Sequence, residues 1–391
     1  MQLTIVIPAY NEEQAIGSTI QRLLDARDEI VRQSLVHGVT IIVVSDGSTD
    51  RTAEIASGFK EIKLIAYEKN RGYGAAIKTG FAQTDDELVG FLDADGTCDP
   101  FVFIALLEKQ QETKADVVLG SRLGENSHMT LLRRIGNVFF ATLINLWAGT
   151  RIKDPASGMR VIQRSSLLKL YPLPDGLHFT PAMSAKAIFN RDIVIEEISM
   201  PYEERIGESK LSVVHDGIRF LRAIIETAIV YRPRRLFNLV GLLMIIVALF
   251  LAVSPIQNYL ASHNIEDRAF YRLLMIVLLV NAGILLLGLG FISQRFLELL
   301  HYRKAVTNEN LPLFESLLLN HGLILGLSSL VSSLLFFYKP LLQFIGHSSV
   351  SVNWFSVLAG SFFFWLGFQL ISFGVMGIIF TTVNSNLKEL N

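Results

Sequence analysis

The apolar positions of the chain follow two patterns, and the change between them falls near residue 235. In the first part, short apolar runs rich in β-branched residues alternate with longer stretches in which apolar residues recur every three or four positions. The short runs predict strands and the longer stretches predict helices. This alternation is typical of an α/β sheet with helices on both faces. The predicted strands occupy residues 3–7, 39–44, 62–66, 88–92 and 117–119.

After residue 235 the apolar runs become long enough to cross a lipid bilayer. Four stretches lack Asp, Glu, Lys and Arg, and each reaches the roughly 20 residues that a membrane-spanning helix needs. The last stretch opens with proline, glycine and several serines, which favour a loop over 340–353. The third stretch contains the polar pair Asn320 and His321. We interpret this pair as forming a hydrogen bond between helices rather than as a functional site. We expect four spans, at about 236–256, 273–294, 316–338 and 354–380.

The charged residues support this division and give it an orientation. Residues 236–391 hold only seven Lys and Arg and six Asp and Glu, out of 35 and 36 in the chain. Four spans place both chain ends on one side, which we expect to be the cytoplasmic side of the cell membrane because its flanks are richer in basic residues. Those residues are Arg232, Arg234, Arg235, Arg295, Arg303, Lys304 and Lys388, against Arg268, Arg272 and Lys339 on the other side.

Composition narrows the class of protein further. The only cysteine is Cys98, which excludes a disulfide framework and cysteine-rich zinc or iron–sulfur sites within one chain. The net charge is −1 and no run of Lys or Arg exceeds two residues, so no nucleic-acid partner is indicated. The opening sequence MQLTIVIPAYNE shows neither the basic nor the apolar region of a cleavable signal. We therefore expect the polar part to face a reducing, cytosolic compartment.

Residues 211–235 join the two parts and predict a helix of their own. One interpretation is an amphipathic helix in the membrane interface, with basic side chains near lipid phosphates. The other is a helix that packs on the polar part, and the sequence leaves both open. The predicted organisation is a domain at 1–210, this helix at 211–235 and a membrane domain at 236–391. The apolar positions at helical spacing are Val214, Ile218, Leu221, Ile225 and Ala228.

Polar residues cluster directly after each predicted strand. In open α/β sheets, ligands bind beyond the carboxyl ends of the strands, so these residues are the first candidates for a site. The pattern predicts one cleft at that edge of the sheet. In chain order the residues are Pro8, Tyr10, Asn11 and Glu12; Ser45, Asp46, Gly47, Ser48 and Asp50; Asn70, Arg71, Gly72 and Gly74; Asp93, Ala94, Asp95 and Gly96; and Gly120, Ser121 and Arg122.

Two aspartates after the fourth strand suggest a metal site. Asp93 and Asp95 lie two residues apart, so their carboxylates can face the same way. Oxygen ligands of this kind suit Mg²⁺ or Mn²⁺ bound together with phosphate oxygens. The alternative is an acidic pair that caps a helix or faces solvent. Gly72 and Gly74 lack the third glycine of a dinucleotide fingerprint, and the sequence contains no Walker A, GxSxG or HExxH pattern.

Seven short motifs occur in order along the polar part. They are VIPAYNEE at 6–13, SDGSTD at 45–50, NRGYGAA at 70–76, DADG at 93–96, GSR at 120–122, DPASGMR at 154–160 and RIGESKL at 205–211. Together they resemble family 2 glycosyltransferases with the GT-A fold. Within that family they are similar to the polyprenyl-phosphate glycosyltransferases, the group that includes dolichyl-phosphate mannose synthase. The resemblance implies a Rossmann-like GT-A domain, followed here by a membrane domain of four helices.

The resemblance implies roles for residues that would bind the donor. Asp93 and Asp95 would hold a divalent metal, Mg or Mn, on the diphosphate of a nucleotide sugar. Some relatives carry glutamine two positions after the second aspartate as a further ligand. Here that position is Thr97, so the third ligand is expected to be water or the threonine hydroxyl. The base and ribose are assigned to Pro8, Tyr10, Glu12 and Asp46, and Asp93 completes the nucleotide-binding set.

The resemblance also implies residues that would bind the acceptor and close the site. The cations of a closing loop would offset charge on the leaving diphosphate. That loop is matched by Arg205, Ser209 and Lys210, and its alternative is a salt-bridged loop beside Glu203, Glu204 and Glu208. The sugar or acceptor pocket is assigned to Asp154, Ser157, Gly158, Arg160 and Ser209. A lipid phosphate is assigned to Arg122, Arg133, Arg134 and Asn137, of which Arg133 and Arg134 alternatively form a solvated face.

The implied reaction is inverting transfer of a hexose from a UDP- or GDP-hexose to a polyprenyl phosphate such as dolichyl or undecaprenyl phosphate. A lipid phosphate is already anionic at neutral pH, so no general base is needed. One alternative is a lipid-linked sugar flippase or scaffold with a non-catalytic nucleotide domain. Another is a processive polysaccharide synthase, although no tryptophan here follows arginine as in QxxRW. A homo-oligomer is also open. The residues expected to carry catalysis are Asp93, Asp95, Arg122, Arg205 and Lys210.

Overall fold

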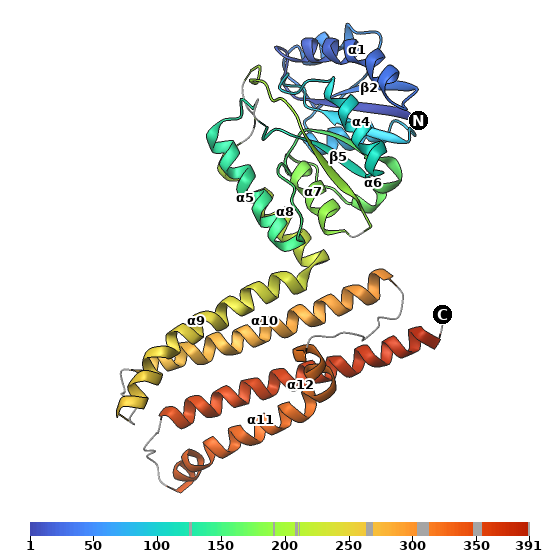
Figure 1. The fold of residues 1–391 in the computed structure, drawn as a ribbon. Helices are drawn as coiled ribbons and strands as arrows, with labels where there is room; N and C mark the ends of the chain where they lie inside the picture. Colours follow the sequence, from blue (N-terminus) through green and yellow to red (C-terminus); the bar gives the residue numbers. More distant parts are fainter. Residues whose placement is uncertain are drawn as a thin grey trace. The chain divides into compact units, whose positions relative to one another are not determined.

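The structure is a computed structural model, and its described residues form two compact units. The units are Met1–Tyr231, an α/β domain, and Arg232–Asn391, which is entirely helical where it is described. Figure 1 draws both as ribbons. The first unit extends beyond residue 210 and includes the helix that follows. The described residues are 1–124, 127–190, 192–207, 210, 212–262, 269–302, 313–346 and 354–389.

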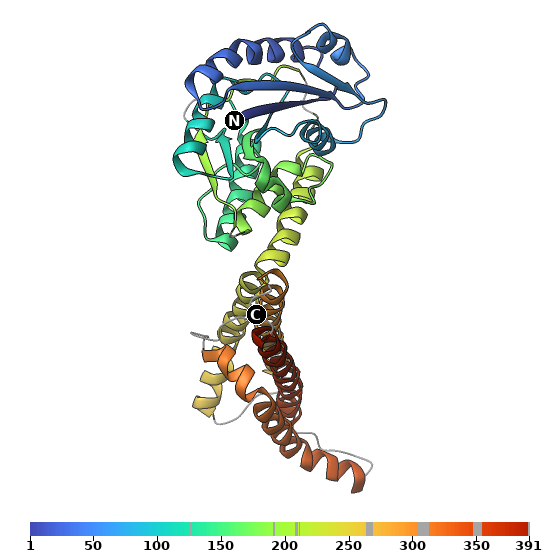
Figure 2. The same cartoon turned by 90° about the vertical axis from the view of Figure 1, so that its right-hand side faces the viewer.

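One seven-stranded sheet organises the first unit (Figures 1 and 2). Its strand order is β3-β2-β1-β4-β6-β5-β7. Neighbouring strands are parallel except for β6, which is antiparallel to both β4 and β5. The start of β6 therefore lies at the edge where the other strands end. The strands are β1 (Gln2–Ala9), β2 (Gly38–Ser45), β3 (Lys63–Ala66), β4 (Leu88–Leu92), β5 (Val117–Ser121), β6 (Met159–Gln163) and β7 (Ile195–Ser199).

The five predicted strands are confirmed, whereas β6 and β7 were not predicted. The sequence of β6 is MRVIQ, which places the charged Arg160 inside a buried strand. The sequence of β7 is IEEIS, and this half-buried strand lies at the edge of the sheet. Charged residues inside both strands weaken the apolar pattern that marks β1, β2, β4 and β5.

Helices cover both faces of the sheet and bury two apolar clusters. Alternate residues of a strand point to opposite faces, so Ile5 of β1 packs with α1 and α4 while Val6 packs with α3 and α7. The helices on the first face are α1 (Ile16–Gln33), α2 (Thr52–Ser57) and α4 (Val102–Thr113). Those on the second are α3 (Tyr73–Phe81), α6 (Arg164–Leu170) and α7 (Phe179–Phe189).

Two further helices, α5 (Leu131–Ala148) and α8 (Val213–Tyr231), pack against each other and against α7. Phe140 of α5 and Phe220 of α8 meet edge to face, with ring centroids 5.8 Å apart. Helix α8 therefore packs on the domain, as one of the two interpretations predicted. Both helices also keep apolar side chains exposed, among them Ile135 and Ile218. A place for α8 in a membrane interface stays a prediction.

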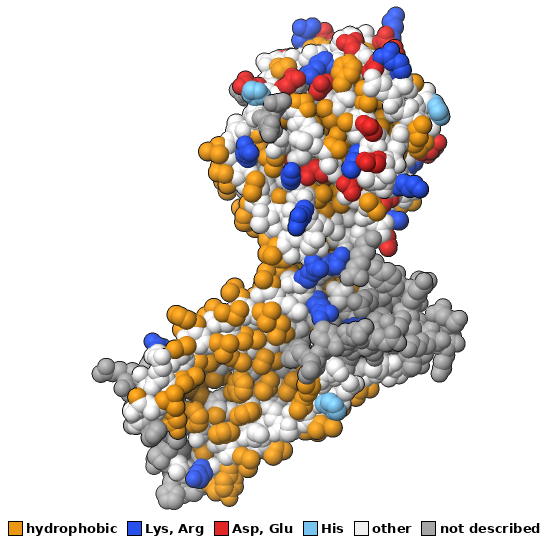
Figure 3. Space-filling model, viewed as in Figure 1, with side chains coloured by type: hydrophobic (Ala, Val, Ile, Leu, Met, Phe, Trp, Pro, Cys, Tyr) orange, Lys and Arg blue, Asp and Glu red, His pale blue; other side chains and the backbone are white. Residues whose placement is uncertain are grey.

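The second unit contains α9 (Pro233–Ser262), α10 (Phe270–Tyr302), α11 (Leu313–Gly346) and α12 (Trp354–Glu389). Within the described ranges, all four are long and apolar enough to cross a membrane. Figure 3 shows apolar side chains over much of the visible surface of this unit. Helix α11 continues through Pro340 to Gly346, so the loop predicted from residue 340 was wrong up to that point. Proline is tolerated in membrane helices because other groups satisfy the freed carbonyl. Residues 347–353 lie outside the described residues.

Glycines bring the helices of the second unit together in two pairs, α9 with α10 and α11 with α12. A Cβ atom at Gly241 would lie 2.8 Å from the carbonyl oxygen of Gly283. A Cβ atom at Gly326 would likewise lie 2.8 Å from the carbonyl oxygen of Gly367. Small residues permit this close approach. The exposed Asn320 amide donates to Ser316 Oγ of its own helix at 3.2 Å. The hydrogen bond between helices expected there is not among those of the described residues.

Candidate active site

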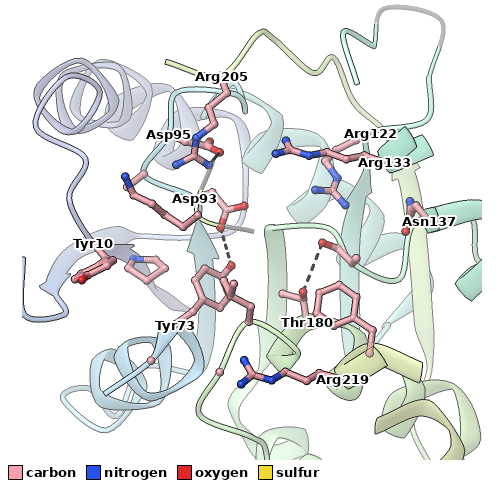
Figure 4. A pocket seen from close by; sticks show the side chains of 18 of the residues that line it. Tyr10, Tyr73, Asp93, Asp95, Arg122, Arg133, Asn137, Thr180, Arg205 and Arg219 are labelled. Carbon is pink, nitrogen blue, oxygen red and sulfur yellow. Dashed lines mark hydrogen bonds and ion pairs between the residues drawn. The ribbon is translucent and has the colours of Figure 1, made fainter. Parts of the chain in front are cut away.

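A pocket of about 570 Å³ opens in the first unit at the carboxyl edge of the sheet. The predicted cleft is therefore present, and α5 and α8 add to its walls. Figure 4 shows Arg122, Arg133 and Asn137 along one side of it and Tyr10 on the other. The predicted site residues that line it are Pro8, Tyr10, Glu12, Asp46, Asp93, Asp95, Arg122, Arg133, Asn137, Arg205 and Lys210.

Asp46 joins the end of β2 to the loop that precedes α3. Its carboxylate accepts the backbone N–H groups of Arg71 at 2.7 Å and Gly72 at 2.8 Å. Gly72 has φ +109°, and a Cβ atom there would lie 2.4 Å from the carbonyl oxygen of Asp175. Only glycine fits this backbone, which explains why the NRGYGAA motif needs glycine at this position. These two hydrogen bonds fix the position of the Asp46 carboxylate, and Asp46 lines the pocket.

Asp93 is enclosed at the centre of the pocket. The Tyr73 hydroxyl donates to its Oδ1 at 2.6 Å (Figure 4). Its Oδ2 lies 1.7 Å from the position of a Cβ atom at Gly158, so the carboxylate fills space that any other residue at 158 would occupy. Burial, followed by the charge of Asp95, raises the pKa of Asp93 to about 7. Burial and the Asp93 charge also raise the pKa of Tyr73, so the phenol stays a hydrogen-bond donor.

Asp95 and Glu12 share one arginine. Arg205 Nη1 donates to Asp95 Oδ2 at 2.8 Å, and its Nη2 donates to Glu12 Oε1. The other oxygen of Asp95 accepts the Thr97 hydroxyl at 2.6 Å. Burial raises the pKa of Glu12 despite the opposing effect of Arg205. The cation of the predicted closing loop thus neutralises two predicted donor-binding carboxylates.

The residues at the end of β4 fit a divalent cation. Both carboxylates line the pocket there, and the glycine at 158 leaves room for the Asp93 carboxylate. Burial, followed by the charge of Asp95, raises the pKa of Asp93, and a bound dication would stabilise its charged form. Among the described residues, no cluster of three or more acidic, histidine or cysteine side chains could complete a metal site. Further ligands would then come from a substrate or water.

Arg122 is held rigidly at the opposite side of the pocket. Its Nε and Nη2 donate to the two oxygens of Asp154 at 2.7 and 2.8 Å, and its backbone N–H donates at 2.9 Å. Asn137 Nδ2 donates to Asp154 Oδ1 at 2.8 Å. Burial alone would raise the pKa of Asp154, but Arg122 holds it below its usual value. The buried carboxylate therefore fixes two residues that line the pocket.

Some predicted site residues do not line the described pocket. The prediction assigned Asp154, Ser157, Gly158 and Arg160 to the sugar or acceptor pocket. None of these four lines the described pocket, whereas Ala156 of the same segment does, and Arg160 lies within β6. Ser157 donates to the carbonyl oxygen of Gly120. Arg160 is fully buried against carbonyl oxygens, and burial lowers its pKa to about 10. The exposed Arg134 also lies outside the lining. Ser209 is outside the described residues.

The prediction missed several residues of the pocket wall. Tyr73 carried a signal, since it lies within the NRGYGAA motif that follows the third strand. Most of the others lie on helices or on the segment before α7, where the sequence does not show which side faces a ligand. They include Leu132, Gly136, Phe140, Thr180, Gly217, Arg219 and Phe220.

Comparison with known proteins gives the family. The family model described as "Glycosyl transferase family 2" matches residues 4–171. A dolichyl-phosphate hexose transferase of Haloferax volcanii is 32% identical over 241 residues, which cover 59% of this chain and 96% of that protein. An undecaprenyl-phosphate 4-deoxy-4-formamido-L-arabinose transferase of Photorhabdus laumondii is 30% identical over 258 residues, 64% of this chain and 75% of that protein.

A longer relative is also similar. The low-salt glycan biosynthesis hexosyltransferase Agl6 of Haloferax volcanii is 30% identical over 262 residues, and the match spans 65% of this chain and 60% of Agl6. Taken with the mixed sheet and the pocket at its carboxyl edge, these matches settle the class. The chain belongs to glycosyl transferase family 2, and its first unit is a GT-A-like domain.

Proposed function

We propose that this protein transfers a hexose from a UDP- or GDP-hexose to a polyprenyl phosphate, with inversion at the anomeric carbon. One observation carries the proposal: a single pocket joins the carboxylate pair Asp93 and Asp95 to the rigid cation Arg122. A pair of carboxylates suits a metal-bound diphosphate, and a fixed guanidinium suits a phosphate. Two relatives, covered by this chain over 96% and 75% of their lengths, carry dolichyl phosphate and undecaprenyl phosphate in their names.

Divalent metal belongs to this proposal. Asp93 and Asp95 would hold Mg²⁺ or Mn²⁺, which when bound would neutralise charge on the donor diphosphate. The Thr97 hydroxyl donates to Asp95 and so fixes the orientation of that carboxylate. Tyr73 fixes Asp93 in the same way. Rigid carboxylates need no rearrangement when the donor arrives.

Apart from the metal, the protein would promote the transfer by positioning the substrates and by supplying cationic side chains. The acceptor phosphate is its own nucleophile, so the pocket needs no base to remove a proton. Arg122 would bind a phosphate oxygen, and Asp154 would keep the guanidinium from turning away. Arg205 and Lys210, which also line the pocket, would offset charge on the departing nucleoside diphosphate. Pro8, Tyr10, Glu12 and Asp46 would bind the nucleoside at the ends of β1 and β2.

The reaction is proposed to occur at the cytoplasmic face of the cell membrane. The basic residues that flank the predicted spans support this orientation, and the four apolar helices of the second unit support membrane residence. An acceptor with a long hydrocarbon chain stays in the bilayer, so a pocket attached to membrane helices needs no separate lipid carrier.

The test is transfer of labelled sugar from a panel of UDP- and GDP-hexoses to a short polyprenyl phosphate, using the purified full chain with Mg²⁺ or Mn²⁺. Labelled product that partitions into organic solvent with one donor supports the proposal and identifies the sugar. Chelation of the metal should remove that product. If no donor yields lipid-linked sugar with folded protein, the proposal is wrong.

Gly158→Ala probes the enclosed position of Asp93. The new methyl group would overlap Asp93 Oδ2, so the carboxylate must move. Displacement of a catalytic group by about 1 Å can cost about 100-fold in rate, and we expect a loss of that order together with weaker Mn²⁺ binding. The control is Gly17→Ala, whose Cβ atom would meet a side-chain methyl of Ile55 at 3.3 Å, and neither residue lines the pocket. Wild-type Mn²⁺ affinity and rate in Gly158→Ala would show that this packing is unimportant.

A further inference from the structure

The wall of the pocket between α5 and α8 contains an unusual amount of empty space. Gly136 of α5 and Gly217 of α8 both line the pocket. At each of them, an added Cβ atom would meet no described atom within 4 Å, once the backbone of its own helix is set aside. Most glycines of the first unit differ, because a Cβ atom there would press on a neighbour. The two glycines therefore leave room that no side chain of the described residues fills.

Apolar side chains bound this space. Phe140 lies one helical turn after Gly136, and Phe220 lies one turn after Gly217, so each phenylalanine shares the face of its glycine. The two rings meet with centroids 5.8 Å apart and close the space on that side. Leu132 lines the pocket one turn before Gly136. We call this space, defined by Gly136, Gly217, Phe140, Phe220 and Leu132, the α5–α8 slot.

Cationic side chains border the slot on the pocket side. Arg133 follows Leu132 on α5, and Arg219 precedes Phe220 on α8, and both line the same pocket as Arg122. Figure 4 shows Arg122 and Arg133 on one side and Arg219 on another. A ligand that fits this arrangement carries an anionic group joined directly to a hydrocarbon. A sugar fits poorly, because its hydroxyl groups would be buried in the slot against apolar walls.

We infer that the α5–α8 slot receives the hydrocarbon that adjoins the acceptor phosphate, and that glycine at 136 and 217 provides room for it. This inference rests on the proposed function and adds the place of the chain next to the phosphate. Charge complementarity identifies the occupant: the cations bind the phosphate while the apolar walls exclude water from the first carbons of the lipid. The slot then distinguishes a lipid phosphate from a free phosphate through burial of apolar surface.

Leucine substitutions test the slot without threatening the fold. Leucine favours a helix more than glycine does, and a Cβ atom at either position meets no described atom within 4 Å outside the backbone of its own helix. A purely structural role therefore predicts equal or higher thermal stability and unchanged activity for Gly136→Leu and Gly217→Leu. The inference predicts instead that KM for farnesyl phosphate rises by about ten-fold or more, while KM for the sugar donor stays unchanged. Thr142→Leu is the matched control, since it adds the same side chain at an exposed position of α5 outside the pocket lining.

A direct binding measurement tests the slot independently of catalytic turnover. Farnesyl phosphate and inorganic phosphate are each titrated into the full-length protein and its variants by calorimetry. We expect both leucine variants to lose farnesyl phosphate affinity by the same factor as KM rises, with Thr142→Leu and the weak binding of inorganic phosphate unaffected. Equal farnesyl phosphate affinity in wild type and both variants overturns the slot, whether or not transfer occurs. Absence of transfer to any lipid phosphate, with slot-dependent binding intact, overturns the proposed function alone.

Discussion

Asp95→Ala is expected to reduce sugar transfer to background. The carboxylate is one of two at the end of β4 that fit a divalent cation, and it is held by Thr97 and Arg205. Loss of a residue that merely supports a metal ligand costs about 10- to 100-fold in affinity or activity, so loss of a ligand itself should exceed about 100-fold. Initial rates with saturating donor and Mn²⁺, followed over a range of metal concentrations, measure the effect.

The control for Asp95→Ala is Asp99→Ala. Asp99 is a nearby acidic residue that accepts the backbone N–H of Phe101 and does not line the pocket. Its removal should leave transfer within a factor of about two, because a change away from the site has little effect. A near-normal rate in Asp95→Ala would refute the proposed metal site, and equal losses in both variants would point to a general defect of folding.

Asp154→Ala is expected to destabilise the first unit by about 3–5 kcal/mol, because it removes the counter-ion of the Arg122 guanidinium, whose side chain is only 14% exposed. Asp154 is fully buried and accepts three hydrogen bonds from Arg122 and one from Asn137. Thermal unfolding of the purified protein, followed together with transfer, measures the cost. We also expect weaker use of the lipid acceptor, since Arg122 and Asn137 both lose the group that orients them.

Asp85→Ala is the matched control for Asp154→Ala. Asp85 also pairs with an arginine, Arg164, at 3.2 Å, but its side chain is fully exposed. Exposed ion pairs contribute about 0–1 kcal/mol, so this variant should unfold close to the wild-type temperature. Unchanged stability of Asp154→Ala would mean that Arg122 finds another partner, and the rigid cation would then be no part of the site.

The residues at the strand ends show how much of the site could be predicted from the sequence. Pro8, Asp46, Asp93 and Arg122 were predicted to share one cleft, and all four line the pocket. That prediction worked because parallel strands must end at the same edge of a sheet, so the order of elements along the chain is enough to bring these residues together.

Asp154 marks the limit of that reasoning. Its motif was assigned to the pocket, yet its side chain lies behind Arg122 as a buried counter-ion. Asp154 lies in the connection that leads into β6, an antiparallel strand that was not recognised from the sequence. Similarly, the amphipathic pattern of α8 was visible, but only the packing of α5 and α8 shows that Gly217 and Phe220 face the pocket. Such contacts depend on three-dimensional packing that the sequence pattern does not contain.

The division of the chain after Tyr231 affects how variants of this protein should be interpreted. The described pocket draws all its lining residues from between Pro8 and Phe220, within the first unit. A substitution in α9 to α12 therefore leaves the identity of every pocket-lining residue unchanged. When such a substitution alters turnover in a bilayer, the first explanation to test is delivery of the lipid. Activity measured with a water-soluble acceptor then distinguishes impaired delivery of the lipid from impaired catalysis.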